Sequence, residues 1–181
     1  MAIIGLGKTI GHKKKQIGVE HRMENKFTLI KVFAGTSSQG TVLEELPAEY
    51  LSDQEFKLCA SPGLALGLAK GDTIKLHPNG DFELIKHGGN FCIQIYKEQP
   101  IKEKIEAVES IVKKELSGSL DGFYNGSLAF TAPISNGFDA TNHTFNKIRD
   151  VLEAEYYYSN IYKNLYDFED EELVSWAREL D

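Results

Sequence analysis

The segment from residue 120 to residue 166 constrains the fold most strongly, because three element patterns follow one another within it. Apolar side chains alternate along residues 127–134, which predicts a strand with one buried face. Between residues 138 and 152 apolar side chains recur at spacings of seven, three and four residues, which predicts an amphipathic helix. The aromatic and β-branched run at residues 156–162 predicts a second strand. The chain is therefore expected to be an α+β protein.

Short strand patterns fill the first half of the chain. They lie at residues 27–34, 41–46, 55–59, 73–76, 81–87 and 91–97. Pro47 is expected to end the second strand, and Asn79-Gly80 predicts a tight hairpin because both residues tolerate positive φ. Residues 61–72 are punctuated by glycine and predict an irregular loop that covers the core. Short strands joined by tight turns predict a small N-terminal β-barrel or rolled sheet.

Two further helices are expected in the second half. Pro100 suits the first turn of a helix that Gly118 ends, and residues 168–180 predict a C-terminal helix. Ser135 or Asn136 is expected to cap the middle helix. With the strands around them, the first two helices give the order strand, helix, strand, helix, strand. That order predicts a ferredoxin-like α+β half.

The expected organisation has three parts that differ in charge. Residues 1–26 form a flexible basic leader, residues 27–97 a β-rich domain, and residues 98–181 an α+β domain with an acidic C-terminal helix. The leader carries a net charge of +4 and the whole chain −7, so the remaining residues carry −11. Because such a body repels a phosphate backbone, nucleic acid is not an expected partner.

Hydropathy and cysteine usage favour a cytoplasmic protein. The apolar runs are too short to cross a bilayer, and the first residues lack the long apolar stretch of a signal peptide. Cys59 and Cys92 lie in separate strand patterns without the spacing of a metal site. Both are therefore expected to be reduced core residues, and neither membrane insertion nor secretion is expected.

The short motifs of the sequence do not indicate catalysis. Gly5-Leu-Gly-Lys-Thr9 lacks the earlier glycine of a phosphate-binding loop, because Ala2 occupies that position. His87 precedes Gly88-Gly89, as in an oxyanion-hole loop, but no nucleophile elbow accompanies it. The protein is therefore expected not to be an enzyme, with no cofactor and no bound metal.

Motifs spread over residues 40 to 165 carry a family resemblance. They are Leu46-Pro47, the loop from Pro62 to Asp72, the run from Gly80 to Tyr96 with His87-Gly-Gly-Asn90, Leu120-Asp-Gly122, Phe130-Thr-Ala-Pro-Ile134 and Tyr156-Tyr-Tyr-Ser-Asn-Ile-Tyr162. Together they resemble the bacterial domain of unknown function 4265 family. The resemblance transfers no catalytic residue, and it implies an immunity-type antidote of a bacterial toxin system. In that family the tyrosine strand continues towards a short tryptophan-containing end, whereas here an acidic insertion comes before Trp176.

The acidic insertion is the expected site of partner binding. Its carboxylates lie beside tyrosines and a tryptophan, which are residue types that anchor protein interfaces. The expected partner-binding residues are Tyr162, Tyr166, Asp167, Glu169, Asp170, Glu171, Glu172 and Trp176. The alternative for this cluster is a solvated charge run at a helix N-terminus.

The expected function is that of an immunity protein that neutralises a basic toxin domain by direct binding, with charge steering the encounter. The first alternative is a small-molecule-binding or regulatory module that uses a cleft between the two halves, around His87 and the exposed tyrosines. An enzyme without short motifs is the third hypothesis. The sequence predicts neither the identity of the partner nor the oligomeric state.

Overall fold

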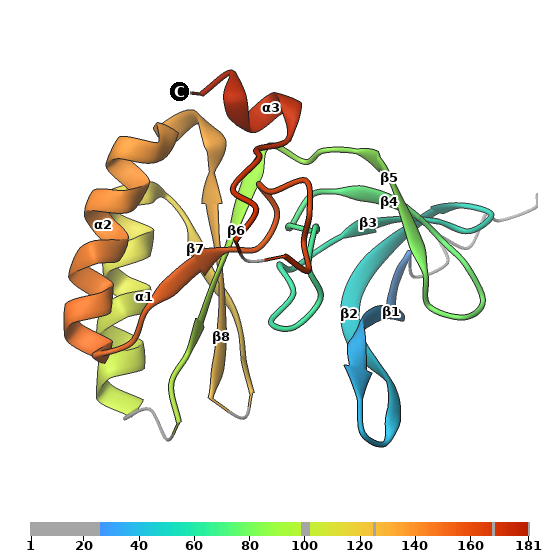
Figure 1. Cartoon of the computed structure of the whole chain (residues 1–181), viewed down its shortest axis with the longest axis horizontal. Helices are drawn as coiled ribbons and strands as arrows, with labels where there is room; N and C mark the ends of the chain where they lie inside the picture. The colour runs from blue at the N-terminus through green and yellow to red at the C-terminus, as the bar shows by residue number, and fades with distance from the viewer. Residues whose placement is uncertain (1–25, 99–101, 125, 168, 181) are drawn as a thin grey trace, which may run out of the picture.

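The computed structural model describes residues 26–98, 102–124, 126–167 and 169–180 and has a mixed α+β architecture (Figure 1). Its strands are β1 (Phe27–Ser37), β2 (Gly40–Ser52), β3 (Glu55–Leu58), β4 (Thr73–Leu76), β5 (Phe82–Lys86), β6 (Asn90–Tyr96), β7 (Ser119–Tyr124), β8 (Ser127–Pro133) and β9 (Tyr156–Tyr158). Its helices are α1 (Lys102–Leu116), the single 3-10 turn η1 (Ile134–Asn136), α2 (Gly137–Leu152) and α3 (Ser175–Arg178). Of the expected basic leader, residues 1–25 lie outside the described residues.

Strands β1 to β5 form one antiparallel sheet in which each strand pairs with the next one along the chain. The buried side chains of this sheet and of the loop that covers it are Ile30, Val32, Leu46, Ala48, Leu58, Ala65, Leu68 and Ile74. Ala65 and Leu68 come from residues 61–72, which form no helix or strand. The prediction of an irregular loop that covers the core is therefore confirmed.

Of the expected β-barrel or rolled sheet, the closed barrel is wrong, because β1 and β5 remain the two edges of an open sheet. The sheet nevertheless curls. The backbone N–H of Phe33 in β1 donates to the carbonyl of Gly80 at 2.8 Å, so the β4–β5 turn touches β1. Gly80 has a φ of 92°, which suits the predicted hairpin turn. A single contact of this kind does not replace a strand ladder, and the loop at residues 61–72 covers the apolar face instead.

Pro47 was expected to end the second strand, and this prediction is wrong. β2 runs on to Ser52, and Pro47 lies opposite Leu29 of β1. A proline lacks the N–H donor but keeps its carbonyl acceptor, and the Pro47 carbonyl accepts a hydrogen bond of 2.9 Å from Cys59 N–H. The strand continues because the lost donor is not needed at this position.

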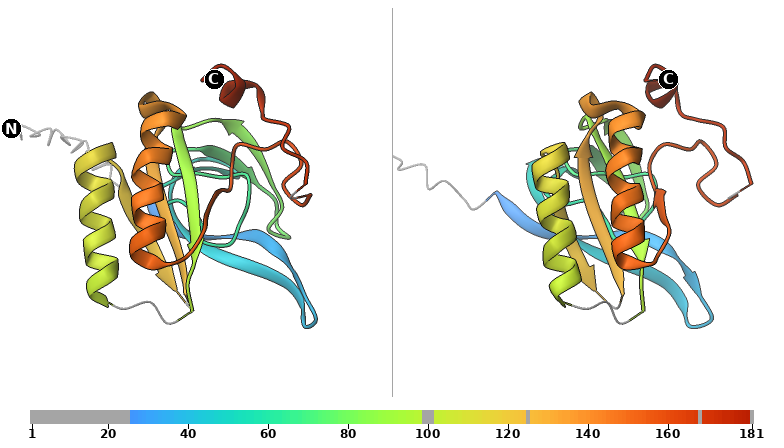
Figure 2. Two further views of the ribbon diagram at one scale, coloured as in Figure 1. Left: turned by 60° about the vertical axis from the view of Figure 1, so that its left-hand side comes forward. Right: turned by 90° about the vertical axis from the view of Figure 1, so that its left-hand side faces the viewer.

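The second sheet has the strand order β7-β8-β6-β9, and all of its pairs are antiparallel. Helices α1 and α2 lie side by side on one face of it (Figures 1 and 2). Its core contains Phe91, Ile93, Ile95, Val108, Val112, Leu116, Leu128, Phe130, Phe145, Ile148 and Leu152. Strand β7 was not predicted, because Asp121 and Gly122 interrupt the apolar alternation and the register shifts between Leu120 and Gly122.

The tyrosine strand is shorter than the predicted residues 156–162, since β9 ends at Tyr158. Beyond it the side chain of Asn160 replaces the backbone as a partner of β6. Asn160 Oδ1 accepts from Cys92 N–H at 3.0 Å, and Asn160 Nδ2 donates to the Asn90 carbonyl at 3.0 Å. A side-chain amide has the same donor and acceptor as a peptide group, so it satisfies the β6 edge while the chain turns away.

The predicted C-terminal helix over residues 168–180 is also mostly wrong, because only Ser175–Arg178 are helical. The Asp167 carboxylate accepts from Glu169 N–H at 3.1 Å, and the Asp170 carboxylate accepts from Glu172 N–H at 2.9 Å. Such local side-chain bonds hold the backbone in turns and compete with helix formation. Leu173 and Leu180 still pack against the core, as their spacing suggested.

The capping prediction for α2 is half right. Asn136 occupies the N-cap position, but its side chain makes no capping hydrogen bond. Its Nδ2 donates instead to the carbonyls of Leu116 at 2.9 Å and Pro133 at 3.0 Å. The side chain therefore ties the start of α2 to the end of α1.

The loop at residues 61–72 joins the two sheets, because it packs against the face of the second sheet that α1 and α2 leave uncovered. Gln94 of β6 donates through Nε2 to the carbonyls of Pro62 at 2.8 Å and Ala65 at 3.3 Å. The buried Cys92 donates through Sγ to the Pro62 carbonyl at 3.4 Å. The join between the sheets is thus largely polar, in contrast to the two apolar cores.

Candidate functional site

A groove of about 600 Å³ lies along α2, β9 and the segment that follows β9. Its lining residues are Phe138, Asp139, Asn142, Asn146, Arg149, Glu155, Tyr156, Tyr157, Tyr158, Ile161, Tyr162 and Leu173. Four tyrosines give the groove its character, and we call it the tyrosine groove. Successive strand residues point to opposite faces of a sheet, which is why Tyr158 is buried while 43% of Tyr157 is exposed.

Polar contacts between α2 and β9 order the tyrosine side chains. The hydroxyl groups of Tyr156 and Tyr158 both donate to Oδ1 of Asn142, at 3.2 and 2.8 Å. Tyr156 also lies 3.4 Å from Oδ1 of Asn146, which is one helical turn further along α2. Burial raises the pKa of Tyr156 and of Tyr158, so both phenols stay neutral donors at physiological pH. On the other face of the sheet Tyr157 donates to Gln94 Oε1 at 2.5 Å.

A smaller cavity of about 160 Å³ adjoins the groove and shares Tyr157, Tyr158 and Tyr162 with it. Its other lining residues are Leu66, Ser159, Asn164, Leu165, Asp167, Asp170 and Glu171. The structure therefore brings three of the predicted carboxylates to the same place as a predicted tyrosine. Burial and the nearby Glu171 carboxylate raise the pKa of Tyr162.

The other predicted site residues lie in different surroundings. Tyr166 is 67% exposed, and Glu169 is exposed. Glu172 is exposed and its carboxylate forms an ion pair with Lys163. These three residues lie in the same turn-rich segment but outside the lining of both cavities.

Trp176 is separated from the acidic cluster and packs on His87. The two rings are stacked with centroids 4.0 Å apart and planes inclined by 25°, and Phe91 lies beside the indole at 5.9 Å. His87 Nδ1 accepts from Gly89 N–H at 3.2 Å, whereas Nε2 is buried without a hydrogen-bond partner among the described residues. Burial lowers the pKa of His87. Trp176 therefore acts here as a packing residue that covers His87.

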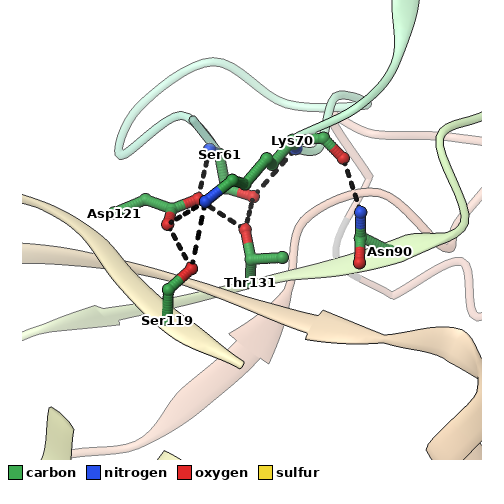
Figure 3. A network of polar contacts seen from close by, with 6 residues as sticks. All are labelled: Ser61, Lys70, Asn90, Ser119, Asp121 and Thr131. Carbon is green, nitrogen blue, oxygen red and sulfur yellow. Dashed lines mark hydrogen bonds and ion pairs between the residues drawn. The ribbon is translucent and has the colours of Figure 1, made fainter. Parts of the chain in front are cut away.

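A buried polar network between the two halves has no counterpart in the sequence-based prediction (Figure 3). Its centre is Asp121 of β7, whose side chain is only 3% exposed. The carboxylate accepts from the Ser61 N–H at 2.8 Å and from the hydroxyl groups of Ser119 and Thr131, each at 2.5 Å. Lys70 Nζ lies 3.3 Å from Oδ1 of the same carboxylate.

The network also connects its outer members to one another. The Ser61 and Thr131 hydroxyl groups lie 2.5 Å apart, and Lys70 donates through its backbone N–H to the Ser61 hydroxyl at 3.0 Å. Figure 3 shows the Lys70 ammonium turned towards Asp121 and Ser119. Because every polar group of the network has a partner, this arrangement connects the two sheets through satisfied hydrogen bonds. The motif Leu120-Asp-Gly122 contained the signal, a charged residue next to the apolar Leu120.

The cysteines and histidines do not form a metal centre among the described residues, where no group of three metal-ligating side chains occurs. Cys59 and Cys92 are both free thiols, as predicted, but only Cys92 is a buried residue, because Cys59 is half-buried and lies outside both apolar cores. Complete burial raises the pKa of Cys92 to about 12, so its thiol is unreactive. Within the described part of the chain no helix is long and apolar enough to span a bilayer.

Comparisons with known proteins agree with the resemblance noted in the sequence. The crystal structure of a hypothetical protein from Neisseria gonorrhoeae is similar in fold, with a TM-score of 0.55 and 18% sequence identity over 73% of this chain and 93% of that chain. No curated protein matches the chain. The family model described as domain of unknown function (DUF4265) matches residues 44–156, which run from within β2 to the first residue of β9 and include β3 to β8, α1 and α2. The chain therefore belongs to the DUF4265 family.

Proposed function

We propose that the protein acts by binding another protein through the tyrosine groove and the acidic segment, which we define as residues 167 and 169–172. The observation that carries this proposal is the position of Asp167, Asp170 and Glu171 beside tyrosines in adjoining cavities. Tyrosine combines a large rigid contact area with a polar hydroxyl, and it is enriched in protein interfaces. An open groove of this kind accommodates side chains of a partner surface.

Charge favours a basic partner. The carboxylates of Asp139 and Glu155 line the groove, and no ion pair engages either of them within the described part of the chain. The cation of the groove, Arg149, lies 3.4 Å from the Asp150 carboxylate. A surface with this balance attracts positive charge and steers the encounter with a basic protein.

The finer form of the proposal is that the protein is an immunity protein of the bacterial cytoplasm and that its partner is a basic toxin domain. The family resemblance and the acidic body of the chain support this form. Neutralisation by binding requires no catalytic residue and no cofactor. The strand order β7-β8-β6-β9, with α1 after β6 and α2 after β8, supports a ferredoxin-like description of the second half.

The direct experiment is a pull-down of the tagged full chain against the product of its neighbouring gene, at low and high salt. We expect capture at low salt and reduced capture at high salt. Y157A and Y166A should weaken capture, because Tyr157 lines both cavities and the exposed Tyr166 directly precedes the acidic segment. Y96A is the matched control, since Tyr96 is 65% exposed at the end of β6, lines neither cavity and does not belong to the acidic segment or its neighbours in sequence. Equal capture by all three variants would contradict the assignment of the surface.

A second candidate function is small-molecule binding in the cleft between the two sheets. The observation that favours it is a cavity of about 460 Å³ lined by β2, the loop and β7, with Leu43, Leu64, Phe123 and Tyr124 among its walls. Ligand sites are commonly apolar clefts of this size between packed units. A thermal-shift screen tests this candidate, because a ligand that binds only the folded state raises the melting temperature.

A further inference from the structure

A cavity of about 440 Å³ lies where β3, β4 and β5 meet the connection to β6. Its lining residues are Lys57, Leu58, Lys70, Gly71, Thr73, Lys86, His87, Gly88 and Asn90. None of these residues carries a carboxylate, although residues 27–181 have a net charge of −11. The lysines and the threonine of this lining supply hydrogen-bond donors, which indicates a negatively charged ligand.

The strand register places two of the lysines on either side of a hydroxyl group. Lys57 of β3 lies opposite Thr73 of β4, and Thr73 lies opposite Lys86 of β5. Residues directly opposite in a sheet share a face, with Cβ atoms about 5 Å apart. Both lysines are exposed, and neither forms an ion pair with a described residue. The two lysines therefore lie on the strands on either side of Thr73, and the β4–β5 register shifts directly after the Thr73–Lys86 pair.

The floor of the cavity is formed by two backbone segments in close contact. A Cβ added to Gly88 would lie 2.2 Å from the carbonyl carbon of Gly71, so the segments approach as only glycine allows. Behind them the buried Asp72 carboxylate accepts from Gly88 N–H at 2.6 Å and from Ala69 N–H at 2.8 Å. Asn90 Nδ2 donates to the Lys70 carbonyl at 2.8 Å. The floor is thus held in place by the fold itself.

Lys70 contributes its backbone and alkyl stem to the cavity but not its charge, because its ammonium group points to Asp121 and Ser119 (Figure 3). On the other side of β3 from Thr73, Glu49 of β2 lies directly opposite Lys57. The Glu49 carboxylate therefore competes with a bound anion for the Lys57 ammonium. The donors that face a ligand are therefore Lys57, Lys86 and Thr73.

We propose that this cavity binds the phosphate group of a small molecule between the Lys57 and Lys86 ammonium groups, with the Thr73 hydroxyl as a further donor. Lysine binds phosphate as a point charge, and charge-assisted hydrogen bonds are the stronger kind. The volume lies within the range of small-molecule sites. This site is separate from the protein-binding surface, since the two share no lining residue.

Calorimetric titration of the full chain with inorganic pyrophosphate, at an ionic strength fixed by sodium chloride, tests the site. We expect saturable binding that is at least about tenfold weaker in K57A/K86A, because each charge-assisted contact contributes more than a factor of ten. K102A/K113A removes two exposed lysines of α1 and should leave the affinity unchanged. E49Q should tighten binding, because it removes the competing carboxylate.

Two results would overturn the proposal. The first is a pyrophosphate affinity of K57A/K86A that equals the affinity of the unmodified chain. The second is an equal loss of affinity in K102A/K113A, which would mean that the overall charge of the protein, and not this cavity, determines binding. A thermal unfolding curve of each variant verifies that it is folded. Since Lys57 and Lys86 are exposed, we expect their substitution to leave the melting temperature nearly unchanged.

Discussion

The carboxylate of Asp121 in β7 accepts a hydrogen bond of 2.8 Å from the backbone N–H of Ser61, which lies 60 residues earlier in the chain. This contact fixes the loop of the first half on the second sheet. The Asp121 side chain is 3% exposed and is also within 3.3 Å of the Lys70 ammonium. A buried carboxylate with this many donors connects the two halves as one structural unit.

D121N is expected to lower the free energy of unfolding by roughly 2 to 4 kcal/mol, because it leaves buried donors and Lys70 without their charged acceptor. Urea unfolding followed by the fluorescence of Trp176, the single tryptophan, measures the change. D150N is the control, since the Asp150 side chain is 74% exposed and should change stability by less than about 0.5 kcal/mol. Equal stability of the two variants would show that the network does not join the halves.

Asp72 should make stability depend on pH. Burial raises its pKa from 3.8 to about 6, against the lowering effect of the Gly88 and Ala69 N–H groups. Between about pH 4 and about pH 6 the folded state therefore keeps a proton on Asp72 that the unfolded state releases. The free energy of unfolding should fall as pH rises from about 4 to about 6, by at most roughly 3 kcal/mol. Urea unfolding between pH 4 and pH 7 tests this, and D72N should remove the slope.

G88A is expected to destabilise the fold by more than about 2 kcal/mol, because the added Cβ would lie 2.2 Å from the Gly71 carbonyl carbon and 2.5 Å from Asp72 N. The nearest atoms all belong to the backbone of Gly71 and Asp72, which cannot move aside as the end of a flexible side chain can. G122A is the matched control, since nothing lies within 4 Å of a Cβ built on Gly122. The difference between the two melting temperatures is the measurement, and similar values would contradict the close backbone contact.

W176A is expected to raise the pKa of His87 towards its ordinary value, because removal of the stacked indole admits water to the imidazole. NMR titration of the His87 ring signals measures this shift. The same variant should leave partner capture unchanged if it stays folded, since Trp176 lies outside both cavities. An unchanged His87 pKa would mean that the indole does not cause the burial.

Local sequence patterns predicted correctly the elements in which apolar residues recur with the regular period of a strand or a helix. Residues 127–134 and 138–152 became β8 with η1 and α2, because their apolar side chains pack in the core, although β8 is buried on both faces and not on one as predicted. The predictions of β9 and of the C-terminal helix failed where side chains make the hydrogen bonds that backbone groups make in a strand or a helix. Asn160 pairs with β6 in place of a strand, and Asp167 and Asp170 bind their own backbone in place of a helix.

The candidate site was only partly predictable for a similar reason. Tyr162, Asp167, Asp170 and Glu171 are close in sequence, and local turns keep them together in space. Asn142 and Asn146 were missed because they belong to α2 and meet the tyrosines only through the packing of the sheet. Trp176 was misplaced because its contact with His87 joins residues far apart in the chain.

The central claim is that the acidic segment steers a basic protein partner onto this surface. The most direct test is the association rate of the captured partner, measured between low and high salt for the unmodified chain, D170K/E171K/E172K and E103K/E106K/E109K. The second triple variant makes the same charge change on the exposed face of α1. We predict a rate that falls with salt and is at least about tenfold lower in D170K/E171K/E172K alone. An unchanged rate in that variant, or an equal loss in both, would contradict the claim.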